Sequence, residues 1–260
     1  MNTDTVISIT TVPHRINTSL PLVINSLKKQ TIKCKILVCI PKIYRRWNNS
    51  CEIPDYLKND SDIIVWYTKK DYGPGTKFLG ALEYIEDNED IKNIITMDDD
   101  MYYDYDKFIQ YMLDKSIEHP NTALTFGGIK LMHTPYRWRN GLNYKNYNCY
   151  VDSPAGCNGV LYPIEPFRTD KRIFTFMDNL PDGIYNDDDA YFGIILSIMN
   201  IPLYSIVREG ELAASHTATP QCKRSCLNTT IDSNIPRCDN ESQIYQHAVD
   251  NNYLPSKFRL

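Results

Sequence analysis

Residues 93–100 read Asn-Ile-Ile-Thr-Met-Asp-Asp-Asp, an apolar run that ends in three consecutive carboxylates. The run from Asn93 to Met97 predicts a buried strand, which would deliver the three acids to the edge of a β-sheet. Like charges this close repel, so solvent, a basic partner or a divalent cation must stabilise them. Oxygen-only clusters suit Mg²⁺ or Mn²⁺, which commonly share their coordination between carboxylates and substrate phosphates. Asp98, Asp99 and Asp100 therefore suggest a site for a phosphorylated ligand.

On both sides of this strand, short apolar runs alternate with helical patterns along the chain. Strands are predicted at residues 5–11, 35–40, 63–67, 93–97, 123–126, 158–162 and 203–207, and helices at 20–29, 76–85, 106–119 and 187–199. We expect Thr76 to cap the helix that it begins. The alternation predicts an α/β fold with a mostly parallel central sheet flanked by helices.

The composition excludes some classes of protein. The 260 residues carry a net charge of −4, without the basic stripe of a nucleic-acid scaffold. No segment approaches the ~18 apolar residues that span a bilayer, and the N-terminus shows no signal-peptide pattern. We therefore expect a soluble, cytoplasmic protein with no transmembrane segment and no nucleic-acid partner.

The candidate ligand site lies where predicted strands end. In parallel sheets, ligands bind beyond the carboxyl ends of the strands. Thr10, Thr11, Asp71 and the acids at 98–100 all lie at or just after such ends, so we expect them to converge.

The segment from Asp71 to Lys77 reads Asp-Tyr-Gly-Pro-Gly-Thr-Lys before a predicted helix. Its glycines allow close backbone approach, and a helix N-terminus offers free N–H groups to an anion. Lys77 adds positive charge in the first turn. The spacing differs from that of a P-loop.

Two further groups lie in the second half of the chain. Asp187, Asp188 and Asp189 open a predicted helix, where the helix dipole alone favours acids. Alternatively, one of them is a general base, a role that contributes ~10²- to 10⁴-fold in rate. His216 follows the last predicted strand and is a candidate third metal ligand, although a lone histidine is more often structural.

The order of these motifs resembles that of GT-A-fold glycosyltransferases, most closely the family-2-like enzymes with which large DNA viruses and bacteria build surface glycans. The resemblance extends from Thr5 to about Thr217. The segments that carry it are Thr-Thr-x-Pro-x-Arg (10–15), Asp-x-Gly-Pro-x-Thr-Lys (71–77), Ile-Ile-Thr-x-Asp-Asp-Asp (94–100), Gly-x-x-Gly-Val-Leu-Tyr-Pro (156–163) and Asp-Asp-Asp before an apolar helix (187–189).

The resemblance implies roles for residues on the donor side. Thr10, Thr11 and Arg15 would line the nucleotide pocket. Asp71 would contact the base or ribose, and Lys77 would reach the base, ribose or diphosphate.

The acids at 98–100 resemble the DxD motif of this family. Asp98 would face the ribose or an adjacent donor group, with Asp99 also on the donor nucleotide. Asp100 would bind Mn²⁺ or Mg²⁺, with Asp98 and His216 as further metal ligands. The implied donor is a UDP-, GDP- or dTDP-sugar, and the implied acceptor is a glycan or glycoconjugate.

The resemblance also implies roles for residues near the donor sugar and the acceptor. Gly156 and Gly159 would lie under the donor sugar and acceptor, near Asp187 and Asp189. Asp188 best matches the catalytic base of inverting members, with Asp187 or Asp189 possible by register. Cys157 and Asn158 depart from the small apolar or glycine-rich stretch that is usual between the two glycines.

We expect one glycosyltransferase domain over residues 1–217, with a nucleotide-binding half (1–100) and an acceptor-binding half (101–217). Residues 218–260 are predicted to form an irregular extension packed on it. The aromatic and basic stretch 136–150 is our hypothesis for the acceptor side. If the protein is viral, the expected location is the host cytoplasm.

Three other functions are open to this kind of scaffold. A sugar-phosphate nucleotidyltransferase would need a glycine-rich, basic loop after the first strand, where this chain has Thr10 to Arg15. A haloacid-dehalogenase-type phosphatase would carry its Asp-x-Asp after the first strand instead of the fourth. A non-catalytic glycan- or nucleotide-binding module is the third possibility.

Overall fold

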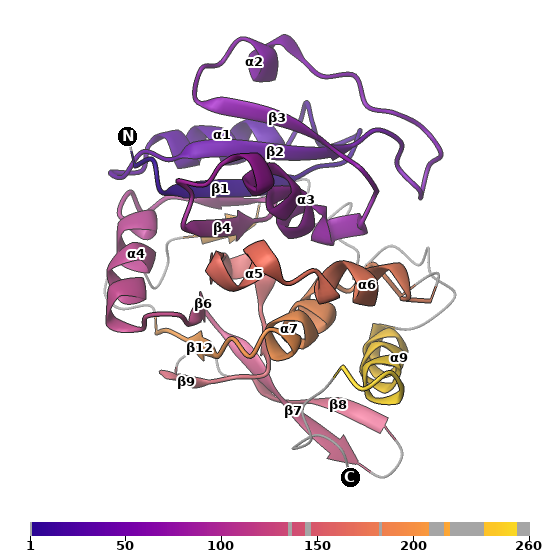
Figure 1. Cartoon of the computed structure of the whole chain (residues 1–260). Helices are drawn as coiled ribbons and strands as arrows, with labels where there is room; N and C mark the ends of the chain where they lie inside the picture. Colours follow the sequence, from indigo (N-terminus) through magenta and orange to yellow (C-terminus); the bar gives the residue numbers. More distant parts are fainter. Residues whose placement is uncertain are drawn as a thin grey trace.

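The computed structural model describes residues 2–134, 137–143, 147–181, 184–207, 216–218 and 237–253. An eight-stranded sheet with the order β3-β2-β1-β4-β11-β6-β12-β9 forms the centre of the molecule (Figure 1). Its strands are β1 (Thr5–Thr10), β2 (Lys35–Pro41), β3 (Ile63–Thr68), β4 (Asn93–Met97), β6 (Ala123–Thr125), β9 (Cys149–Tyr150), β11 (Val160–Pro163) and β12 (Leu203–Ser205).

The first four strands of this sheet run parallel. Ile7 of β1 lies opposite Ile36 of β2 and Ile95 of β4, and β2 pairs in parallel with β3. The strand β11 runs antiparallel between β4 and β6, whereas β12 is parallel to β6. The predicted α/β fold with a mostly parallel central sheet and flanking helices is confirmed.

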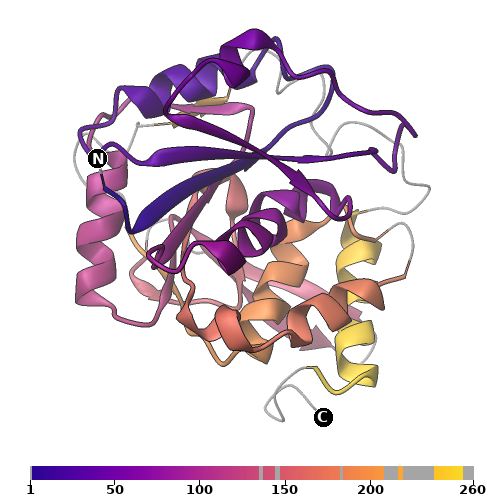
Figure 2. The ribbon, with the colours of Figure 1, turned by 45° about the horizontal axis from the view of Figure 1, so that its top comes forward.

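Helices cover both faces of the sheet, which is why its parallel strands are apolar on both sides. Val6 of β1 belongs to the core formed with α3, α6 and α7, and the next residue, Ile7, belongs to the core formed with α1, α2 and α4. Figure 2 shows the indigo α1 and the orange α6 and α7 on opposite sides of the sheet. The helices are α1 (Leu20–Lys28), α2 (Asp55–Lys58), α3 (Thr76–Tyr84), α4 (Phe108–Glu118), α5 (Glu165–Thr169), α6 (Arg172–Asp178), α7 (Asp188–Ile198) and α9 (Arg237–Asp250).

Two small sheets accompany the central one, and neither was expected from the sequence. The strands β7 (Gly128–Thr134), β8 (Arg137–Asn143) and β10 (Ser153–Pro154) form one, and the β7–β8 hairpin projects at the bottom of Figure 1. The strands β5 (Met101–Tyr103) and β13 (His216–Ala218) form the other. The stretch 136–150 contains β8 and β9, and its residues 136 and 144–146 lie outside the described residues.

The predicted cap of α3 is wrong. Gly75 is the N-cap residue, and Thr76 is already helical. The Thr76 hydroxyl oxygen instead accepts a hydrogen bond from the backbone N–H of Tyr72 at 3.0 Å, because a short 3₁₀ turn at Gly73–Gly75 leads directly into the helix. The strand predicted at 158–162 begins later, at Val160, because residues 156–158 form another 3₁₀ turn.

The C-terminal residues predicted to be irregular contain the helix α9, so that expectation is wrong for residues 237–250. Its side chains Ile244, Tyr245 and Ala248 are buried in the same core as α7. The helix α9 lies beside α7, at the lower right of Figure 1. Burial against α7 explains why a polar segment is helical here.

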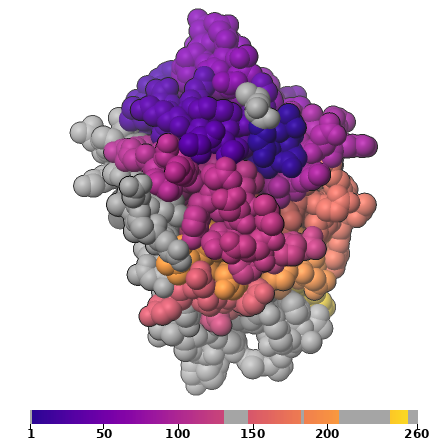
Figure 3. Space-filling view, turned by 90° about the vertical axis from the view of Figure 1, so that its left-hand side faces the viewer, coloured from indigo at the N-terminus to yellow at the C-terminus, as the bar shows by residue number. Residues whose placement is uncertain are grey.

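The helix α4 lies on the opposite side of the molecule from α9 (Figure 1). Figure 3 looks at the left-hand side of Figure 1, and the magenta residues of α4 occupy the middle of this face. Within the ranges that the structure describes, every helix is too short or too polar to traverse a bilayer.

Candidate functional site

The candidate site begins at the carboxyl ends of β1 and β4. Because these strands are parallel neighbours, with Ile9 opposite Met97, the residues that follow them emerge side by side. The Thr11 hydroxyl donates a hydrogen bond of 2.6 Å to Oδ2 of Asp99. The structure thus brings together two of the predicted donor-side residues.

Arg15 neutralises two of the three acids that follow β4. Its Nη1 lies 2.7 Å from Oδ1 of Asp99 and 3.0 Å from Oδ2 of Asp100. Both acids are almost fully buried, with 5% and 7% of their surface exposed. Burial disfavours the charged guanidinium, but the carboxylates of Asp99 and Asp100 outweigh it and raise the pKa of Arg15. A basic partner therefore relieves much of the repulsion expected within this cluster.

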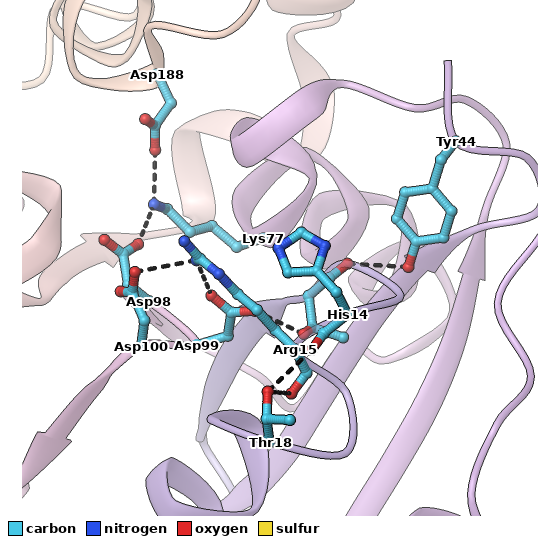
Figure 4. A network of polar contacts seen from close by, with 10 residues as sticks. His14, Arg15, Thr18, Tyr44, Lys77, Asp98, Asp99, Asp100 and Asp188 are labelled. Atoms are coloured by element: carbon cyan, nitrogen blue, oxygen red, sulfur yellow. Dashed lines mark hydrogen bonds and ion pairs between the residues drawn. The ribbon is translucent and has the colours of Figure 1, made fainter. Parts of the chain in front are cut away.

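Lys77 connects the third acid to the start of α7. Its Nζ lies 2.6 Å from Oδ1 of Asp98 and 2.6 Å from Oδ2 of Asp188 (Figure 4). The lysine is 2% exposed. Burial alone would lower its pKa, yet the charges of Asp188 and Asp98 raise the pKa of Lys77 well above its usual value. Lys77 is therefore a buried cation bound by two carboxylates.

The three acids at the start of α7 have different surroundings. Asp187 is the N-cap residue and is buried. Asp189 accepts a hydrogen bond of 2.8 Å from the backbone N–H of Gly156, and the Ser153 hydroxyl donates to its carbonyl oxygen at 2.7 Å. Asp188 is the member of the three whose carboxylate meets Lys77.

The turn at residues 156–158 lies against this group. A Cβ atom on Gly156 would be 2.6 Å from Oδ1 of Asp189 and 3.8 Å from Nζ of Lys77. Gly156 is thus adjacent to the acids and to Lys77. Gly159 has a φ of +85° and packs against the ring of Phe108, so its place is in the core below the site.

Two predicted donor-side residues bind the backbone instead of facing the Lys77 network. The Thr10 hydroxyl donates to the carbonyl oxygen of Cys39 at 2.8 Å. Asp71 accepts hydrogen bonds from the backbone N–H groups of Gly73, at 2.8 Å, and Arg45, at 2.7 Å. These contacts shape the turn before α3, where Gly73 has a φ of +59°.

His216 lies in β13, where its backbone pairs with that of Tyr103 in β5. Its side chain lies outside what the structure describes, so the predicted histidine ligand stays a prediction. Among the described residues, no group of three or more His, Cys, Asp or Glu side chains is arranged to hold a metal ion.

The acids of the site carry more negative charge than their basic partners neutralise. Four carboxylates, from Asp98, Asp99, Asp100 and Asp188, face two cations, so the network has a formal charge of −2. The side chain of Asp98 is 26% exposed and that of Asp100 is 10% exposed. Net negative charge on carboxylate oxygens is chemically compatible with a hard divalent cation, although the described residues form no group of three ligands around one point.

The sequence did not point to Tyr191 as a part of the site. Tyr191 lies one helical turn after Asp188 and is fully buried. Its hydroxyl donates to the carbonyl oxygen of Tyr72 at 3.2 Å, which ties α7 to the turn before α3. A tyrosine within an otherwise apolar helix was the available signal, but its partner is distant in the sequence.

Comparison with known proteins supports the fold. No family model and no curated protein matches the chain. Among solved structures, S. aureus TarS matches with a TM-score of 0.50 and 15% identity, over 84% of this chain and 37% of that chain. The structure of TarS 1-349 gives 0.48 and 12%, over 95% and 71% of the two chains. A197 from STIV gives 0.38 and 12%, over 78% and 81%.

The first of these matches shows that this chain shares the fold of the matched part of TarS. The present chain spans 37% of the length of the TarS chain that it matches.

Proposed function

We propose that this chain is a glycosyltransferase that moves a sugar from a UDP-, GDP- or dTDP-sugar to a hydroxyl group of a glycan or glycoconjugate, with inversion. The likeness to TarS supports a glycosyltransferase fold. The observation that carries the proposal is the bridge from Asp98 through Lys77 to Asp188. It brings the acid that directly follows β4 and the candidate base of α7 to the two sides of one buried cation.

In the proposed reaction, Asp188 accepts the proton of the acceptor hydroxyl. The hydroxyl oxygen then bonds to the anomeric carbon of the donor sugar, on the face opposite the leaving group. The bond to the diphosphate oxygen breaks, and its electron pair departs with the nucleoside diphosphate. A single displacement of this kind inverts the anomeric centre. The carboxylate of Asp188 is 15% exposed, which leaves it open to an acceptor.

The donor would bind at the carboxyl ends of β1 and β4. Thr11 and Arg15 hold Asp99 and Asp100 at this edge. Thr10 and Asp71 would line the pocket indirectly, since their side chains fix the backbone around it. The donor sugar would lie near Gly156, whose missing side chain lets its backbone approach the carboxylate of Asp189.

Mn²⁺ or Mg²⁺ is the proposed cofactor, with Asp98 and Asp100 as its ligands and His216 as a third. The formal charge of −2 in the network supports this choice. When bound, the cation supplies charge stabilisation to the departing diphosphate.

The proposal is tested with a panel of nucleotide sugars, assayed with Mn²⁺, with Mg²⁺ and with a chelator. Asp188→Asn should lower turnover by ~10²- to 10⁴-fold while nucleotide binding persists, because a general base is lost and the donor contacts are kept. Asp55→Asn is the matched control, since Asp55 also begins a helix but is 88% exposed and distant from this network.

The possible outcomes separate the candidate functions. A non-catalytic binding module would bind nucleotide or glycan equally well with and without the Asp188 carboxylate. Absence of both turnover and metal-enhanced nucleotide binding across the panel would reject the enzyme proposal.

A further inference from the structure

The role of Lys77 can be specified further if the chain is the glycosyltransferase proposed above. The motif resemblance places this lysine on the donor nucleotide. We propose instead that Lys77 is a positioning residue, which holds Asp188 in place as the base and fixes its distance from Asp98. In this role the ammonium group touches neither the diphosphate nor the acceptor.

The exposure of the three side chains supports this role. The Lys77 side chain is 3% exposed, whereas those of Asp98 and Asp188 are 26% and 15% exposed. The ammonium group thus lies beneath the two carboxylates. Its Nζ donates a hydrogen bond to Oδ1 of Asp98 at 2.6 Å and forms an ion pair with Oδ2 of Asp188 at 2.6 Å. A substrate that enters the site meets the acids first.

The energy of the buried charge leads to the same conclusion. An ammonium ion removed from water is costly unless carboxylates compensate it. Because the Lys77 side chain is only 3% exposed, a diphosphate would reach its ammonium group by moving Asp98 or Asp188 aside, which would leave a carboxylate without its cation. Binding the diphosphate elsewhere avoids that cost.

The backbone of Lys77 provides a rigid support for this arrangement. Lys77 lies in the first turn of α3, and its carbonyl oxygen accepts a hydrogen bond from the hydroxyl of the fully buried Ser8 in β1. The lysine is therefore fixed to the central sheet at one end and to Asp188 at the other. Because misplacement of a reacting group by 1 Å can cost ~10²-fold in rate, such a support matters for catalysis.

The experiment replaces Lys77 with Met, which keeps most of the length of the side chain and removes its charge. We expect kcat to fall by ~10²-fold, and the Kd for UDP with Mg²⁺ and the donor KM to change less than about threefold. Lys115→Met is the control, because Lys115 pairs with Glu118 on the exposed side of α4. Thermal unfolding measurements on each variant would check that it is folded.

A double-mutant cycle asks whether Lys77 acts through Asp188. If it does, Lys77→Met should cause little further loss of kcat in a protein that already carries Asp188→Asn. The proposal would be overturned if the two substitutions reduce kcat independently, so that the double variant loses the product of the single losses, and if Lys77→Met also weakens UDP binding by tenfold or more. Lys77 would then be a nucleotide ligand.

A second measurement needs no substitution at Lys77. In protein labelled with ¹⁵N-lysine, the Lys77 ammonium resonance should change little when UDP and Mg²⁺ are added and should shift strongly in Asp188→Asn. A large shift on adding UDP, with none in Asp188→Asn, would contradict the proposal. If the wild-type protein lacks turnover, the proposed function fails, whereas this measurement still decides the contacts of Lys77.

Discussion

Gly75→Ala tests whether α7 is fixed against the turn that precedes α3. The added methyl carbon would lie 1.9 Å from the hydroxyl oxygen of Tyr191, and 2.7 Å and 2.8 Å from two of its ring carbons. Gly75 has a φ of −69° and a ψ of −8°, which alanine adopts without strain. The ring of Tyr191 is fully buried and has no space to rotate away. The substitution therefore forces α7 and the turn apart.

The expected loss of stability follows from opposing effects. Alanine in place of glycine at a compatible backbone position stabilises a protein by ~0.4–1 kcal/mol. Overpacking of a full core costs ~1–3 kcal/mol, and the hydrogen bond from Tyr191 to Tyr72 contributes ~0.5–1.5 kcal/mol more when it is broken. We expect a net destabilisation of about 1–3 kcal/mol from these values. Each kcal/mol lowers the Tm by roughly 2–4 °C in a domain of this size.

Urea unfolding of Gly75→Ala, Tyr191→Phe and the double variant provides the assay. Phenylalanine removes the atom that would lie 1.9 Å from the new methyl group. The double variant should therefore be more stable than the sum of the single effects by at least ~0.5 kcal/mol. Since Asp188 lies on the first turn of α7, turnover should also fall in Gly75→Ala. A Gly75→Ala protein as stable as wild type, with additive effects in the double variant, would refute this reasoning.

Two more predictions concern charged pairs. Arg15→Met should destabilise the protein by ~3–5 kcal/mol in urea unfolding, because it leaves the buried Asp99 and Asp100 without this cation; a loss far below 1 kcal/mol would contradict this account. A hydrogen bond from Lys171 lowers the pKa of the half-exposed Glu86 in the folded protein. The stability that this pair provides is therefore present above the pKa of Glu86 in the unfolded chain, and it disappears as the pH falls through the lower pKa of Glu86 in the folded protein. Lys171→Met should thus lower the free energy of unfolding at neutral pH by at most about 1 kcal/mol, and not at all near pH 2. Equal differences at both pH values would contradict this prediction.

The central strands were predictable because their signal is local. The runs that became β1 and β4 are apolar throughout, as expected for parallel strands covered on both faces, and the prediction for β4 agrees with the structure at both ends. In contrast, the fully buried core residues among the described side chains of α9 are Ile244, Tyr245 and Ala248, within a polar segment. Its burial depends on α7, which is itself buried on nearly all sides.

The sequence predicted which strand ends contribute residues to the candidate site, but it did not predict the long-range contacts between those residues. Strand ends in the sequence indicated that Thr11 and the acids at 98–100 share one edge, and the structure brings them together. The position of Lys77 between Asp98 and Asp188 depends on how α7 packs on α3, which no local pattern encodes. The catalytic and metal-binding roles of these residues stay predictions until they are measured.

The position of β11 has a consequence for biosynthesis. Val160–Pro163 pairs with β4 on one side and β6 on the other, although both neighbours precede it in the chain. A nascent polypeptide therefore carries β4 and β6 out of the ribosome with open edges until the strand between them has emerged. Such edges recruit strands from other molecules. We therefore expect aggregation to be favoured in the interval between translation of β6 and insertion of β11.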